Sequence, residues 1–156
     1  PALAAEREGV RIDPAELVAA ADRLMESHEF LLVEGAGGLM VPVSGGFLVA
    51  DLARQLALPL LIVCRPSLGT INHTLLTVHA ARTLDLPVAG FIVNGMPEKP
   101  GVAEEEAPHA LASLASADIL GVLPQVAGSD EEKVEALATA LGRMPTLPWL
   151  LHILGV

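Results

Sequence analysis

An acidic residue followed by a glycine-rich segment is the part of the sequence best suited to chemistry. Residues 30–33 are apolar, Glu34 follows them, and residues 35–38 read Gly-Ala-Gly-Gly. A carboxylate in such a place needs a cation or hydrogen-bond donors, and magnesium ions beside phosphates take oxygen ligands of this kind. Glycines let backbone amides approach an anion without hindrance. The pattern indicates a metal and phosphate site, although a strand-end ion pair beside a tight turn would give the same pattern.

Two common nucleotide-binding motifs are absent from the sequence. A dinucleotide fingerprint needs a third glycine at position 40, where the chain has Met40. The lysines are Lys99 and Lys133, and proline and valine follow them, so no Gly-Lys-Ser/Thr phosphate loop occurs. The phosphate contacts of a nucleotide therefore cannot come from a Walker-type loop of this chain.

A second candidate site covers residues 65–74, which read Arg-Pro-Ser-Leu-Gly-Thr-Ile-Asn-His-Thr. The segment follows an apolar run and leads into an expected helix, whose free amides attract anions such as a substrate carboxylate. Taken alone, ordinary capping of the helix by Ser67 or Thr70 is the simpler explanation.

A third candidate is Asn94-Gly95, at the end of another apolar run. The Asn94 amide offers both a donor and an acceptor to the edge of a nucleotide base. Asn-Gly is also a common turn, so this pair is weak by itself.

The elements that must position these residues follow from periodicity. Apolar runs recur at about thirty-residue intervals, the spacing of a strand plus a crossover helix. They lack polar alternation, which predicts a parallel sheet with both faces covered. The four predicted strands cover residues 30–34, 60–64, 88–93 and 119–123. Helices are predicted over residues 47–57, 70–84, 103–115 and 130–142.

Helix ends also carry sequence signals. Asp13 caps a helix that begins at Pro14, and Glu16 completes a capping box. Asp130 is the expected cap of the last predicted helix, and Gly142 closes it.

Composition bounds the class of protein. The chain has 156 residues, of which 52% are hydrophobic and 18% are charged, as expected for one folded domain. A net charge of −10 argues against a nucleic-acid surface. The sequence shows neither a membrane-length apolar run nor a secretory signal, so we expect a cytoplasmic protein that does not bind a membrane. The single cysteine, Cys64, lies in an apolar run and is expected to be buried and inert.

Taken in order and spacing, three segments resemble the dethiobiotin synthetases. They are residues 33–38 (Val-Glu-Gly-Ala-Gly-Gly) with Pro42, residues 68–73 (Leu-Gly-Thr-Ile-Asn-His) and residues 90–94 (Gly-Phe-Ile-Val-Asn). The similarity covers roughly residues 1–141. It implies an α/β fold with a doubly wound, mainly parallel sheet of the P-loop NTPase type, in a cytoplasmic homodimer. It also implies a ligase of biotin biosynthesis that uses ATP and Mg²⁺ to close a cyclic urea from 7,8-diaminopelargonate and CO₂.

The resemblance also assigns roles to residues. Glu34 would be a ligand of the magnesium ion. The pocket for phosphate and carbamate would be lined by Gly35, Ala36, Gly37 and Gly38. The substrate carboxylate would be bound by Gly69, Thr70, Ile71 and Asn72. The nucleotide base would be held by Asn94, Gly95, Pro124, Gln125, Val126 and Glu131.

The chain departs from this family at its front. The family's first strand, phosphate loop and catalytic lysine have no counterpart here, so the expected organisation is an incomplete α/β domain at 1–143 and an apolar tail at 144–156. The tail must pack on the body or on a second subunit. We expect the chain to act as part of a larger enzyme and not alone. The alternatives are a non-catalytic dimeric module that binds the ligand, and a related amidase that acts on another carboxylate.

Overall fold

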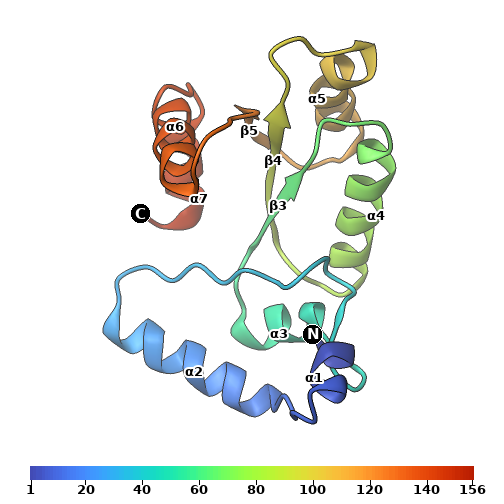
Figure 1. Ribbon diagram of the computed structural model, residues 1–156, viewed down its shortest axis with the longest axis vertical. Coiled ribbons are helices and arrows are strands. Elements are labelled where there is room, and N and C mark those ends of the chain that lie inside the picture. Colours follow the sequence, from blue (N-terminus) through green and yellow to red (C-terminus); the bar gives the residue numbers. More distant parts are fainter. The chain divides into compact units, whose positions relative to one another are not determined.

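The computed structural model describes residues 1–156, which form seven helices and five strands (Figure 1). The chain divides into two compact units. One comprises Pro1–Pro59 with Ala80–Pro87, and the other Leu60–His79 with Val88–Val156. None of the helices combines the length and apolarity that a membrane crossing requires. The expected boundary between residues 143 and 144 stays a prediction.

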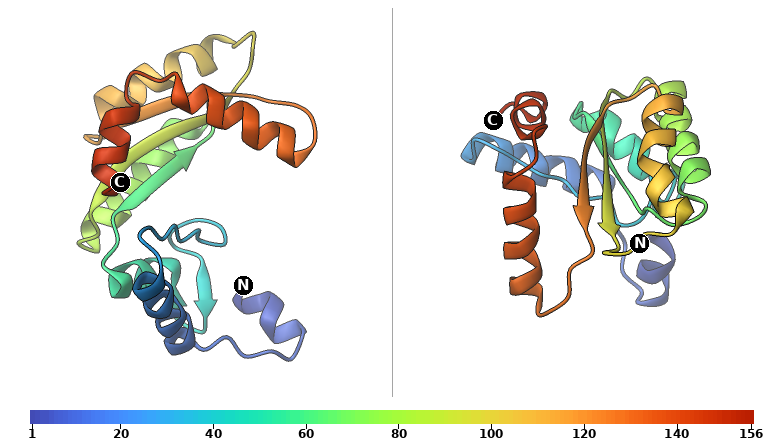
Figure 2. Two further views of the ribbon diagram at one scale, coloured as in Figure 1. Left: turned by 90° about the vertical axis from the view of Figure 1, so that its left-hand side faces the viewer. Right: turned by 90° about the horizontal axis from the view of Figure 1, so that it is seen from above.

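The second unit is built on a three-stranded parallel sheet. Its strands are β3 (Leu60–Cys64), β4 (Val88–Met96) and β5 (Ile119–Pro124), in the order β3-β4-β5. Helix α4 (Thr70–Thr83) follows β3, and α5 (Val102–Leu114) follows β4 (Figure 2). Parallel neighbours need such crossovers because each chain must return to the same end of the sheet. The predicted α/β class is thereby confirmed.

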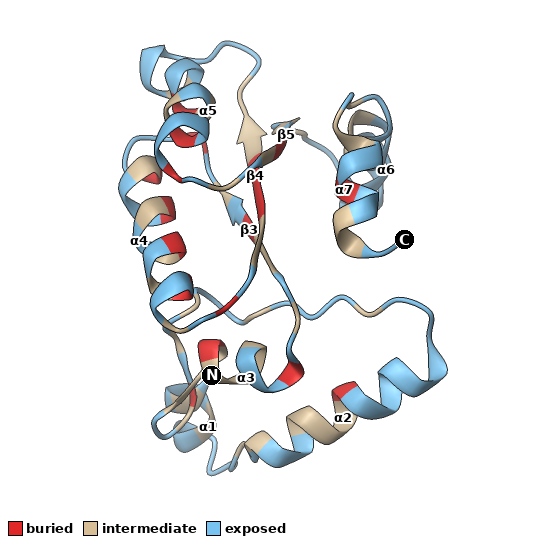
Figure 3. Cartoon of the chain, turned by 180° about the vertical axis from the view of Figure 1, so that it is seen from behind, coloured by how far each residue is buried: buried red, intermediate tan, exposed pale blue.

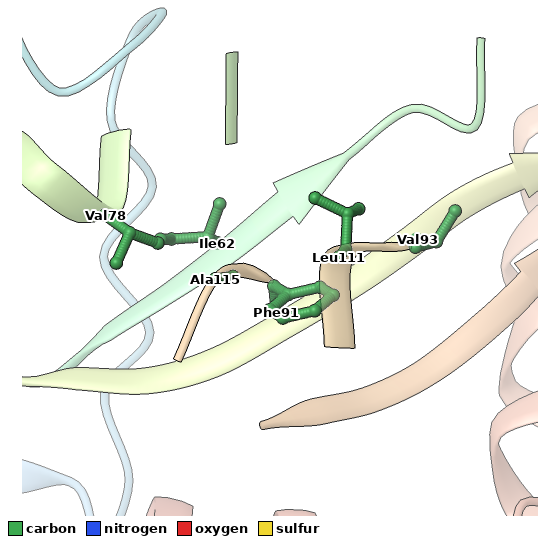
Figure 4. Packing of buried hydrophobic residues seen from close by; sticks show 6 residues of the cluster. All are labelled: Ile62, Val78, Phe91, Val93, Leu111 and Ala115. Atoms are coloured by element: carbon green, nitrogen blue, oxygen red, sulfur yellow. The ribbon is translucent and has the colours of Figure 1, made fainter. Parts of the chain in front are cut away.

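One face of this sheet packs against α4 and α5. Phe91 and Val93 of β4 are fully buried there, together with Val78 of α4 and Leu111 of α5 (Figure 4). The buried positions of the two helices lie on their sheet-facing sides (Figure 3). A core this continuous explains why β3 and β4 read as unbroken apolar runs.

The carboxyl-terminal helices α6 (Asp130–Gly142) and α7 (Leu147–Leu154) pack against part of the opposite face. Leu150 of α7 is only 3% exposed and packs with Ile92 and Leu120. The hydroxyl of Thr146, just before α7, donates a hydrogen bond to the carbonyl of Leu120. The apolar tail therefore packs on the sheet of its own chain.

The first unit contains two short strands and three helices. They are α1 (Ala2–Arg7), α2 (Pro14–Ser27), the antiparallel pair β1 (Pro42–Ser44) and β2 (Phe47–Leu48), and α3 (Val49–Leu56). Helix α2 packs on α3, and the hydroxyl of Ser44 donates to the carbonyl of Ile12 at 2.7 Å. These contacts tie the hairpin to the segment that precedes α2.

The first predicted strand, residues 30–34, does not form. This segment has no regular secondary structure, and Leu32 is 70% exposed. A strand exists only through hydrogen bonds to a neighbour, and residues 30–34 pair with no other strand in the structure. The apolar character of residues 30–34 was therefore not sufficient to predict a strand.

The helix predicted over residues 47–57 is observed as α3 (Val49–Leu56), because Phe47–Leu48 pair with β1 as strand β2, and two predicted caps also differ from those observed. Asp13 caps α2 by accepting from the amide of Ala15 at 3.0 Å, but Glu16 makes no capping-box hydrogen bond. Helix α6 is capped by Ser129 and not by Asp130, since the Ser129 hydroxyl accepts from the amide of Glu132. Serine and aspartate cap about equally well, so the correct one of two adjacent candidates could not be chosen from their types.

Candidate carboxylate and nucleotide sites

A pocket of about 210 Å³ opens where β3 ends and α4 begins. Its polar walls come from the connecting segment, with Arg65 and Ser67, and from one face of α4. The α4 residues that line it are Thr70, His73, Thr74 and Thr77, which recur at helical spacing. No aspartate or glutamate lines this pocket, on a chain that carries 19 of them against nine lysines and arginines. The pocket therefore suits an anion.

The start of α4 carries free amides beside this pocket, although of the predicted residues 69–72 only Thr70 lines it. The amide of Thr70 donates to the carbonyl of Ser67, and that of His73 donates to the carbonyl of Gly69. The amides of Ile71 and Asn72 have no backbone acceptor, as expected in a first helical turn. Gly69 has a φ of +96°, which other residues rarely adopt, so its type is set by the turn. The predicted residues 69–72 are thus together at one helix start.

Two hydroxyl groups beneath this helix start are buried without hydrogen bonds. Thr70 is 7% exposed and Thr74 is 2% exposed, and neither Oγ1 atom makes a hydrogen bond of good geometry, although both lie near enough to the Cys64 sulfur to lower its pKa. An unpaired buried hydroxyl costs about 1–3 kcal/mol, so native proteins seldom retain one without a reason. Both side chains line the pocket. A ligand that accepts hydrogen bonds would satisfy them.

Cys64 lines the same pocket and is half-buried, not fully buried as expected. Its thiol lies 3.5 Å from the carbonyl oxygen of Ile92. Burial raises the pKa of the Cys64 thiol above its ordinary value, because it disfavours the charged thiolate. The nearby Thr74 and Thr70 hydroxyls, which could donate to a thiolate, offset part of this shift. At neutral pH Cys64 is therefore a protonated, weakly reactive thiol.

A second pocket, of about 440 Å³, lies beyond the ends of β4 and β5. It is lined by Met96, Pro97, Glu98, Val122, Pro124 and Gln125. The amide of Gln125 donates to the carbonyl of Met96 at 2.7 Å, which fixes the two strand ends side by side. Both pockets therefore occupy the carboxyl-terminal edge of a parallel sheet, where such sheets bind their ligands.

The structure gathers only some of the predicted base-binding residues at the second pocket. Pro124 and Gln125 line it, whereas Asn94, which pairs with Leu123, does not. Gly95 and Val126 are adjacent to lining residues in the sequence, and Glu131 is an exposed residue in the first turn of α6. The base-binding roles of these residues stay predictions.

The acidic and glycine-rich segment belongs to the first unit. Glu34 is exposed, and the loop after it folds onto the start of α3 through hydrogen bonds from the amides of Val49 and Ala50. Gly37 has a φ of +100°, and a Cβ atom there would lie 3.0 Å from Val41. Glycine at this position is therefore required by the turn itself.

The side chains of this chain can be compared with those that the magnesium ion implied by the resemblance would need. No group of three or more His, Cys, Asp or Glu side chains gathers anywhere in the structure. Magnesium bound with nucleotides usually takes one or two carboxylates, with phosphates and water completing the shell. Glu34 fits as one such ligand, but the chain offers no complete metal cage.

Sequence reasoning missed several lining residues. Thr77 lines the first pocket from beyond the candidate segment 65–74, and Met96, Glu98 and Val122 line the second. For the first pocket a signal was available, because positions 70, 73, 74 and 77 share one helical face. For the second pocket no such signal was available, since its lining depends on the register of two strands.

Fold and sites together define an α/β domain of the P-loop NTPase type. The chain belongs to the AAA domain family, which matches residues 1–133. A relative from Bacillus subtilis (strain 168) is 42% identical over 134 residues, which cover 86% of this chain and 58% of the relative. A relative from Aromatoleum aromaticum is 43% identical over 136 residues, which cover 87% of this chain and 60% of the relative. Both carry the name ATP-dependent dethiobiotin synthetase BioD.

These relatives confirm the resemblance found in the sequence. A third, from Thermodesulfovibrio yellowstonii and of the same name, is 37% identical over 142 residues. The chain spans about 58% of the length of the Bacillus relative that it matches. The three relatives thus share the name ATP-dependent dethiobiotin synthetase.

Proposed function

We propose that the chain is part of an ATP- and Mg²⁺-dependent enzyme that closes the cyclic urea ring of dethiobiotin from 7,8-diaminopelargonate and CO₂. One observation carries this proposal. Residues 69–72, selected from the sequence as a carboxylate site, form the start of a helix, and Thr70 of this set lines an acid-free pocket with two unpaired hydroxyls. The similarity to ATP-dependent dethiobiotin synthetases supports the same assignment.

In the proposed reaction one amine of the substrate adds to CO₂ and loses a proton, giving a carbamate. A carbamate oxygen attacks the γ-phosphorus of ATP, and ADP leaves with the electrons of the broken bond. The second amine then attacks the carbamoyl carbon and loses a proton, phosphate leaves, and the urea ring is closed. Each step needs positioned reactants and neutralised charge more than a reactive side chain.

The residues of this chain would do the positioning. The amides of Ile71 and Asn72 would hold the substrate carboxylate, which fixes the far end of the diamine chain. The second pocket would hold the nucleotide base against Pro124 and Gln125. Glu34 would supply one oxygen ligand to magnesium, and the amides of residues 35–38 would face phosphate or carbamate oxygens. When bound, magnesium would neutralise charge on the ATP phosphates.

Further features of the proposal come from the resemblance. The enzyme would be a cytoplasmic homodimer, and its catalytic lysine would be supplied by a segment outside this chain. Because the chain has no Gly-Lys-Ser/Thr loop, we expect it to be inactive by itself.

The test compares the chain alone with the chain joined, at its amino terminus, to the segment of the Bacillus subtilis relative that precedes the matched region. Both proteins receive 7,8-diaminopelargonate, bicarbonate and MgATP, and dethiobiotin is measured by mass spectrometry. We expect product from the joined protein and none from the chain alone. Circular dichroism and MgATP binding show whether the joined protein is folded and loaded with nucleotide.

A folded joined protein that binds MgATP but forms no dethiobiotin would contradict the proposal. Binding of the diamine substrate without any nucleotide turnover would instead favour the non-catalytic module. One observation supports that alternative. The first pocket lies wholly within the second unit, so its lining includes no residue of the unit that carries Glu34.

A further inference from the structure

Among the arginines and lysines of the chain, Arg65 is the one that lines the first pocket. It directly follows β3, lines the pocket beside Ser67, and takes part in neither of the two ion pairs of the structure. The sequence resemblance gives it no role. An arginine without a partner at an acid-free pocket is free to pair with a ligand.

The buried hydroxyls give this pocket a second property. Thr70 and Thr74 are more than nine-tenths buried and have no hydrogen-bond partner, although both line the pocket with Arg65. A carboxylate accepts several hydrogen bonds, so it could take donors from the hydroxyls and from the guanidinium at once. Phosphate could do so too, but the apolar lining by Ile62 and Leu68 matches an anion that carries an alkyl chain.

We propose that Arg65 is a specificity-determining residue that pairs with the carboxylate of an alkyl-chain substrate held at the start of α4. The proposal deepens the proposed function, since it rests on residues 69–72 being the carboxylate site. Arg65 adds charge complementarity to amide contacts that are neutral, and thereby selects an alkyl carboxylate over its uncharged ester or amide.

The single cysteine of the chain provides a direct measure of occupancy. Cys64 lines the same pocket, so a bound ligand shields its thiol from a small neutral reagent such as iodoacetamide. Because burial raises the pKa of Cys64, the reaction is followed above pH 9.0, the ordinary value for a cysteine, where the thiolate fraction is larger. Each alkylation rate is divided by the rate of the same protein without ligand, which removes effects of a variant on the thiol itself.

The probe is nonanoate, and its control is methyl nonanoate. We expect nonanoate to slow alkylation saturably, and Arg65→Gln to raise the concentration needed for half-protection roughly tenfold, the loss of one charge-assisted contact. Arg65→Lys should restore part of the effect because it keeps the charge. Protection by the ester should be the same in all three proteins. The matched control is Arg143→Gln, which removes an equal charge at the end of α6, away from the pocket.

Two results would overturn the inference. Equal half-protection by nonanoate in the unchanged chain and in Arg65→Gln would mean that Arg65 does not pair with the carboxylate. Absence of any protection would mean that the pocket does not receive an alkyl carboxylate. Either result can occur while the joined protein still forms dethiobiotin, so failure of this inference is distinguishable from failure of the proposed function.

Discussion

Thr70 and Thr74 are two residues whose burial lowers the stability of the fold. Their buried hydroxyls have no partners in the structure, whereas Thr77, one turn farther on, donates to the carbonyl of His73 at 2.8 Å. Unpaired polar groups in an otherwise ordinary core are typical of sites that await a ligand.

Thr74→Val tests this interpretation. Valine has nearly the same shape but no hydroxyl, so we expect the free energy of unfolding to rise by about 1–3 kcal/mol in urea denaturation. The same variant should weaken protection of Cys64 by nonanoate. The matched control, Thr77→Val, loses a satisfied hydrogen bond and should lower the free energy of unfolding by about 1 kcal/mol. A Thr74→Val variant that is less stable than the unchanged chain would contradict the account.

At the same scale, the sequence indicates some site residues but not others. Residues 69–72 could be predicted because a glycine followed by small polar residues is itself the signal of a helix start that can bind an anion. Arg65 begins the candidate segment 65–74, but its particular role could not be predicted, because whether an arginine lines a pocket depends on the path of the segment that carries it.

Among the elements, the three strands of the second unit and the helices between them could be predicted from apolar runs and spacing. Residues 30–33 are as apolar as the observed strands, yet residues 30–34 stay irregular because no neighbour supplies hydrogen bonds. A strand forms only when two segments pair, and the apolar pattern of one segment does not show which other segment it will pair with.

Helix α6 offers a test at this scale. The Glu132 carboxylate accepts from the amide of Ser129 at 2.7 Å, and this hydrogen bond, with that to the Ser129 side chain, holds the pKa of Glu132 below its ordinary value of 4.5. A lowered pKa stabilises the folded state above pH 4.5, and the contribution is lost as pH falls through the folded-state value. We therefore expect the stability difference between the unchanged chain and Glu132→Gln to shrink as pH falls below 4.5.

The measurement is urea denaturation across that pH range. Ser129→Ala removes the cap itself and should cost about 1 kcal/mol. A difference between the unchanged chain and Glu132→Gln that grows on acidification would show that the carboxylate does not act through this cap.

At the scale of the molecule, the second unit has its own core on both faces of its sheet. The tail helix α7 completes one face through Leu150, with Ile153 and Leu154 packed nearby. Both candidate pockets lie in this unit, at the edge where its strands end. The unit therefore contains the residues proposed to bind a carboxylate and a base.

Removal of the α7 anchor should destabilise the chain. We expect Leu150→Ala to lower the free energy of unfolding by about 2–5 kcal/mol, because it leaves a cavity beside Ile92 and Leu120. Leu151→Ala, at a neighbouring position that is 39% exposed, should have a much smaller effect. Equal effects of the two variants in thermal or urea denaturation would show that α7 does not pack on this sheet.

The central claim is that the start of α4 receives the carboxylate of the substrate. Its most direct test is a titration of the ¹⁵N-labelled chain with 7,8-diaminopelargonate, followed by amide resonances in solution NMR. We predict saturable shifts at Gly69, Thr70, Ile71 and Asn72, and much weaker shifts with the methyl ester of the same diamine. Unchanged resonances at these four residues, with shifts confined to other segments, would contradict the account.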